Sequence, residues 1–92
     1  MIRLHAIVRG RVQGVGFRYF AHHAASHLGV AGTVRNLPDK SVEVNAEAEE
    51  RAPLETLLKE LNDGPTTAHV ESVDAIWEEN VTPRYDTGFL VA

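Results

Sequence analysis

The sequence contains no cysteine, so neither a disulfide nor a thiolate metal site can stabilise the fold. It also lacks any run of about 18 apolar residues that could cross a membrane. Arg3, His5 and Arg9 interrupt the apolar N-terminal segment that a secretion signal would need. We therefore expect a soluble, cytoplasmic protein that does not bind membranes and that is stabilised by packing.

Acidic side chains are scarce in the first 40 residues. This part holds six basic residues and one acid, a net charge of +5, whereas the remainder holds three basic and twelve acidic residues, a net charge of −9. The basic excess indicates an anion site in the first half of the chain. A pI near 5.7 disfavours a broad nucleic-acid surface, so we expect no nucleic-acid partner.

The 92 residues, 43% of them hydrophobic, predict one domain spanning 1–92. Apolar periodicity then predicts the elements. They are a strand over 2–8, a loop over 10–16, a helix over 17–28, strands over 30–36 and 42–47, a helix around 53–61, a strand over 70–77 with a bulge between 70 and 73, and a short strand over 89–91. This order predicts an α+β, ferredoxin-like fold (βαββαβ plus a short C-terminal strand), a sandwich of an antiparallel or mixed sheet with two helices on one face.

Two glycines, Gly14 and Gly16, stand in the loop between the first strand and the first helix. Glycine permits positive φ and a close approach of the backbone to a bound group. The N–H groups from Gln13 to Arg18 include unpaired donors of the first helical turn, where the helix dipole favours an anion. The guanidinium of Arg18 can pair with two phosphate oxygens at once, although an ordinary surface arginine stays open as an alternative. The spacing fits neither a Walker loop nor the dinucleotide fingerprint, because Tyr19 replaces its third glycine.

Two segments resemble signatures of the acylphosphatase family. The first is Gly10-Arg11-Val12-Gln13-Gly14-Val15-Gly16-Phe17-Arg18, and the second is Gly32-Thr33-Val34-Arg35-Asn36 followed by Val42-Glu43-Val44. The two motifs have the spacing of the family, and the expected order of strands and helices matches it over nearly the whole chain. The resemblance therefore rests on far more than a pair of glycines.

The resemblance implies an enzyme that hydrolyses the carboxyl-phosphate bond of acyl phosphates to a carboxylate and inorganic phosphate, without a metal or cofactor. Arg18 aligns with the phosphate-binding arginine, and Asn36, at the end of what we expect to be the neighbouring strand, with the asparagine that positions the attacking water. Without the resemblance, Asn36 is an ordinary turn residue. The implied phosphate-binding loop uses the backbone of Gln13, Gly14, Val15, Gly16, Phe17 and Arg18.

Two other functions fit the same pattern. A non-catalytic regulatory module could hold phosphate or carbamoyl phosphate in the same loop without hydrolysing it. An RNA-binding domain of this fold is less favoured, because its strands would carry exposed aromatic residues and these strands carry few. The chain shows no evident apolar surface stripe, so we expect a monomer.

Several other residues call for simpler interpretations. His22, His23 and His27 lie on the first helix without a glutamate or third ligand in a zinc-protease spacing, so we expect no metal site. Trp77 is expected in the core or the sheet. The acidic run over 47–50 is expected to charge the start of the second helix.

The sequence departs from the family pattern at three places. Thr33 stands where an aromatic residue is usual, and Lys40 stands where the hairpin commonly has glycine after Asp39. The C-terminal residues, 89–92, lack the frequent basic residue. These departures affect packing, turn strain and the mouth of the site, and they leave Arg18 and Asn36 unchanged.

Overall fold

The computed structural model describes residues 1–86 and 88–92. Seven elements follow one another in the expected order. They are β1 (Ile2–Arg11), α1 (Phe17–Leu28), β2 (Ala31–Asn36), β3 (Val42–Ala48), α2 (Arg51–Asp63), β4 (His69–Glu78) and β5 (Phe89–Val91).

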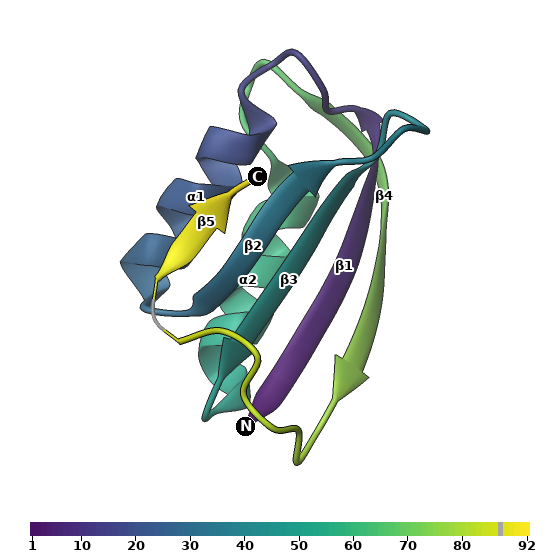
Figure 1. Cartoon of the computed structure of the whole chain (residues 1–92). Coiled ribbons are helices and arrows are strands. Elements are labelled where there is room, and N and C mark those ends of the chain that lie inside the picture. The colour runs from purple at the N-terminus through teal and green to yellow at the C-terminus, as the bar shows by residue number, and fades with distance from the viewer. Residues whose placement is uncertain (87) are drawn as a thin grey trace.

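The five strands form one mixed sheet in the order β4-β1-β3-β2-β5. All neighbouring pairs are antiparallel except β2 and β5, which are parallel. Both helices lie on the same face of the sheet, and the chain after β4 crosses the opposite face before β5 returns beside β2 (Figure 1). The predicted ferredoxin-like α+β fold is therefore confirmed.

The core lies between the sheet and the two helices. Helix α1 packs over β2, β3 and β5, whereas α2 packs over β1, β3 and β4. Alternation along the central strands sends every second side chain into this layer. The largest fully buried side chains are those of Phe17, Leu4, Leu54, Leu57, Leu61, Val8, Val12, Val34, Val42 and Val44.

The boundaries expected from periodicity agree with the structure at most places. The bulge predicted in the fourth strand is present, because Ser72 pairs with Arg9 and Val70 with Gly10, which leaves Glu71 without an opposing residue in β1. The loop expected from residue 10 begins later. Gly10 and Arg11 still pair with β4, so strand pairing extends β1 through residues whose composition is typical of a loop.

Two expectations about neighbours in space were wrong. Strand β2, which ends at Asn36, does not lie beside β1, because β3 pairs with both of them. The acidic run over 47–50 does not act only at the start of α2. Glu47 belongs to β3 and is 2% exposed, and its carboxylate accepts a hydrogen bond of 2.8 Å from Nε of Arg3, the residue opposite it in β1.

Candidate functional site

The loop between β1 and α1 presents backbone donors at the start of the helix. Gly14 and Gly16 have φ values of 73° and 80°, the left-handed region that glycine adopts without strain. The first helical bond runs from the N–H of Phe20 to the carbonyl of Gly16, at 3.0 Å. No side chain in the described part of the chain caps this end of α1. The N–H groups of the first turn are therefore available to a ligand, at the positive end of the helix dipole.

A hollow of about 110 Å³ lies at this helix start. Its volume is several times the ~30 Å³ that a water molecule occupies in the liquid, so a tetrahedral oxyanion fits. Arg18 and Asn36, which are far apart in the sequence, both line it. The complete lining is Val12, Gly14, Gly16, Phe17, Arg18, Tyr19 and Asn36.

The two polar side chains of the hollow differ in how they are held. One guanidinium nitrogen of Arg18, Nη1, donates a hydrogen bond of 2.9 Å to the main-chain oxygen of Ala92, just beyond β5. This bond orients the guanidinium and leaves further donors free, since arginine has five. Asn36 ends β2 opposite Val42, and its exposed amide has no hydrogen-bond partner among residues 1–86 and 88–92.

Two members of the predicted phosphate loop do not line the hollow. Gln13 instead donates from Nε2 to the carbonyl oxygens of Leu37 and Ser41, both at 2.9 Å. The carbonyl of Val15 accepts a hydrogen bond of 2.7 Å from the hydroxyl of Thr67. These bonds tie the loop to the β2–β3 hairpin on one side and to the α2–β4 connection on the other.

The β2–β3 hairpin is itself held by local bonds. The carboxylate of Asp39 accepts hydrogen bonds from the hydroxyl and the backbone N–H of Ser41. Those two bonds, the hydroxyl's first, hold the pKa of Asp39 below its ordinary value. Lys40 has a φ of 74°, which is the left-handed conformation. A residue other than glycine is strained there, as expected from the replacement of the usual glycine by lysine.

Several residues of this region were not foreseen. Val12 belongs to the first motif but had no role assigned to it, and Tyr19 follows the motif directly. Tyr19 is 71% exposed, so a large aromatic side chain beside Arg18 was a usable signal. The contacts of Thr67 and Ala92 depend on how distant segments pack. Nothing in their local sequence indicates them.

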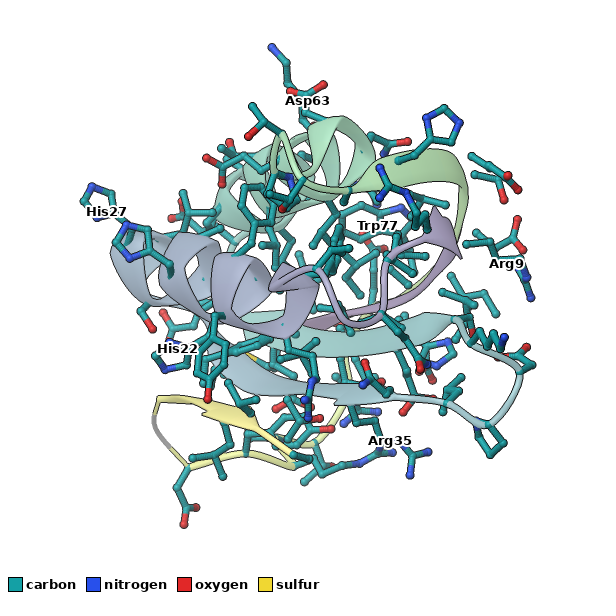
Figure 2. The ribbon with its side chains drawn as sticks, turned by 90° about the horizontal axis from the view of Figure 1, so that it is seen from above. Arg9, His22, His27, Arg35, Asp63 and Trp77 are labelled. Carbon is teal, nitrogen blue, oxygen red and sulfur yellow. The ribbon has the colours of Figure 1, made fainter. Side chains whose placement is uncertain are left out.

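Metal binding has no support in the part of the chain that the structure describes. No group of three histidine, aspartate or glutamate side chains there is arranged to hold a metal ion. The rings of His23 and His27 stack with centroids 6.0 Å apart, and His27 points away from the fold (Figure 2). Among the described helices, none has the length and apolarity to cross a membrane.

Comparison with known proteins decides the family. The family model for acylphosphatase matches residues 4–91. The chain belongs to the acylphosphatase family. An acylphosphatase of Thermus thermophilus is 52% identical over 79 residues, which cover 86% of this chain and 89% of that protein.

Solved structures of acylphosphatases share the fold. The crystal structure of the acylphosphatase from Bacillus subtilis superposes with a TM-score of 0.91 at 32% identity, covering 100% of this chain and 99% of that one. The acylphosphatase from Coxiella burnetii gives a TM-score of 0.85 at 38% identity, covering 98% and 90% of the two chains. The resemblance inferred from the two motifs, and with it the prediction of an acylphosphatase-type hydrolase, is confirmed.

Proposed function

We propose that this chain hydrolyses the carboxyl-phosphate bond of acyl phosphates, and that the hollow at the start of α1 binds the phosphoryl group. One observation carries the proposal: residues of the helix start, Arg18 and Asn36 all line a single hollow of about 110 Å³. Together they meet two needs of phosphoryl transfer: charge stabilisation and the placement of water.

The first need is to stabilise the negative charge on the non-bridging phosphoryl oxygens. The N–H groups of the loop and first turn donate to these oxygens at a positive helix end, and Arg18 adds charge-assisted bonds. The bond from Arg18 to Ala92 holds the guanidinium before the substrate arrives. Such preorganised donors stabilise the transition state because they need little reorganisation during the reaction.

Placement of water is the second need. Asn36 has an unoccupied side-chain amide at the rim of the hollow, and its carbonyl oxygen can accept a hydrogen bond from a water molecule aligned with the scissile bond. The water oxygen attacks phosphorus, the bond from phosphorus to the acyl oxygen breaks, and the carboxylate leaves with the bonding electrons. No carboxylate or imidazole among the described residues lines the hollow, which supports transfer of the water proton to the phosphoryl group itself.

The remaining features of the proposal follow from the sequence. We propose a cytoplasmic monomer with one domain over 1–92, which needs no metal or cofactor and binds neither nucleic acid nor membranes. Its ligands are small acyl phosphates and the inorganic phosphate that they release.

Turnover distinguishes this function from a non-catalytic phosphate or carbamoyl-phosphate module. Benzoyl phosphate hydrolysis should be measured with the purified protein in excess chelator, beside Arg18→Ala. We expect rapid, chelator-resistant turnover that falls roughly 10³-fold or more in the variant, as for other removed arginine and oxyanion donors. Folded wild-type protein that binds phosphate without turnover would support the regulatory module instead.

A further inference from the structure

A second, larger hollow lies on the face of the sheet that the helices leave uncovered. Its volume is about 460 Å³, within the range of roughly 300–1,000 Å³ typical of small-molecule sites. Arg35 of β2 projects on this side of the sheet, away from the helices (Figure 2). Arg84 and Tyr85, from the segment that crosses this face, also line the hollow.

The segment that carries Arg84 and Tyr85 is fixed at its backbone. The carboxylate of Glu47, which is 2% exposed, accepts hydrogen bonds from the N–H of Arg84 at 2.9 Å and of Tyr85 at 3.2 Å. Arg3 donates to the same carboxylate and, through Nη2, to the carbonyl of Thr82 at 3.1 Å. A buried ion pair therefore holds this segment over the sheet, with Arg84 exposed and Tyr85 half-buried.

The charge of this hollow favours an anion. Glu43 is its acidic group, but Nε of Arg35 donates to it at 2.6 Å and the ring of His5 bonds it at 3.0 Å. Burial raises the pKa of Glu43, yet these two bonds outweigh it and hold that pKa below its ordinary value. Arg84 has no acidic partner among residues 1–86 and 88–92, so the hollow retains an uncompensated guanidinium.

Two neutral polar residues and Ala92, whose main-chain oxygen accepts the hydrogen bond from Arg18, complete the lining. Asn45 and Thr33, adjacent across β3 and β2, line the hollow and form no side-chain hydrogen bond within the described residues. We propose that this hollow is a second ligand site, which binds a small metabolite through a carboxylate or phosphate group. The oxyanion pairs with Arg84 and the outer edge of Arg35, while the Asn45 amide and the Tyr85 side chain contact the rest of the molecule.

Amide chemical shifts can separate this site from the hollow at α1. The folded wild-type protein, labelled with ¹⁵N, is titrated with inorganic phosphate and separately with citrate, at constant ionic strength. The amides of Thr33, Asn45 and Tyr85 report the second site, and those of Gly14 and Gly16 report the first. We expect saturable shifts of the amides at the second site with at least one probe. The probe that binds with the higher affinity identifies the preferred anionic group.

Arg84→Ala is the deciding variant. Its backbone N–H, which bonds to Glu47, is retained, so the fold is expected to persist and a thermal melt checks it. We expect affinity at the second set of amides to fall about tenfold or more, with the first set unchanged within about twofold. Arg9→Ala, which removes the same charge from β1 outside the hollow, is the control and should leave both sets within about twofold.

Three results would overturn the proposal. They are shifts that do not saturate with either probe, an unchanged titration in Arg84→Ala, and an equal loss in Arg9→Ala. An equal loss of affinity in Arg9→Ala would show that binding depends only on the net charge of the protein. None of these results depends on hydrolysis, so the test is independent of the function proposed for the first hollow.

Discussion

Gln13 connects the loop at α1 to the hairpin that follows Asn36, and its replacement by leucine removes that connection at nearly constant volume. The two hydrogen bonds from Nε2 reach the carbonyls of Leu37 and Ser41, both at 2.9 Å. Gln13→Leu should therefore loosen the loop relative to the residue that we propose to position water. The expected result is a loss of both stability and turnover.

The size of the stability loss follows from the bonds that remain. Each carbonyl keeps a second donor, since Lys40 N–H donates to Leu37 at 3.1 Å and Leu37 N–H to Ser41 at 2.9 Å. Neither carbonyl is left without a partner, so each lost bond costs its net value of about 0.5–1.5 kcal/mol. We expect a total of about 1–3 kcal/mol. In a domain of this size, each kcal/mol lowers the Tm by roughly 4–8 °C.

Turnover should fall more than stability alone explains. A shift of about 1 Å between reacting groups can cost on the order of 100-fold, so we expect kcat to drop roughly 10- to 100-fold at a temperature where the variant is folded. Urea denaturation gives the free energy of unfolding, and benzoyl phosphate hydrolysis gives kcat.

The matched control is Asn62→Leu on α2. Its amide also donates to a backbone carbonyl, that of Leu58 at 2.9 Å, but in an exposed position and outside the lining of the hollow. We expect a change of at most about 1 kcal/mol and unchanged kcat. The reasoning is refuted if Gln13→Leu keeps kcat within about twofold, or if both variants behave alike.

Three further predictions concern stability. Glu47→Gln leaves the buried guanidinium of Arg3 without its buried ion-pair partner, and it should cost about 3 kcal/mol of unfolding free energy in urea denaturation. The control is Glu78→Gln, whose carboxylate is 51% exposed and 3.7 Å from the same arginine, and it should cost at most about 1 kcal/mol. Equal losses in the two variants would contradict the role of burial. Burial raises the pKa of Glu47, but bonds from the N–H groups of Arg84 and Tyr85 and from Arg3 outweigh it, so the folded pKa lies below the unfolded value. The free energy of unfolding should therefore decline as pH falls below about 4.5, with a shallower decline in Glu47→Gln, and parallel curves would exclude this contribution. Lys40→Gly should stabilise the hairpin by about 0.5–1 kcal/mol, because its φ of 74° is free of strain only for glycine, and a lower Tm would show that the turn is not strained.

Local sequence patterns were sufficient to predict most of the helices and strands. Alternation along β1 and β3 and helical spacing in α1 and α2 report which side chains face the core, and burial of those faces decides the elements. The strand order is different, because it depends on which edges pair. Sequence alone suggested that β1 and β2 were neighbours, whereas β3 lies between them.

The candidate site also contains residues that the sequence indicated and supporting contacts that it did not. Arg18 and Asn36 were identified because their motifs have a recognisable chemistry and spacing, and the structure places both at one hollow. The supports of the site come from distant segments. Ala92 holds Arg18 and Thr67 holds the loop at Val15, and neither contact can be inferred before the chain is folded.

Glu47 shows why charge patterns alone mislead. In the sequence it belongs to an acidic run before a helix, a pattern typical of solvated residues. Its position opposite Arg3 in the sheet, beneath the segment after β4, makes it a buried partner instead. Only the register of β1 and β3 distinguishes the two environments.

The central claim is that Arg18 binds the phosphoryl group while Asn36 positions the water. The most direct test measures kcat for benzoyl phosphate together with the inhibition constant of inorganic phosphate in Arg18→Ala and Asn36→Ala. We expect Arg18→Ala to lose both turnover and phosphate affinity, and Asn36→Ala to lose turnover with phosphate affinity nearly unchanged. Loss of phosphate affinity in Asn36→Ala, or turnover largely retained in Arg18→Ala, would contradict the account.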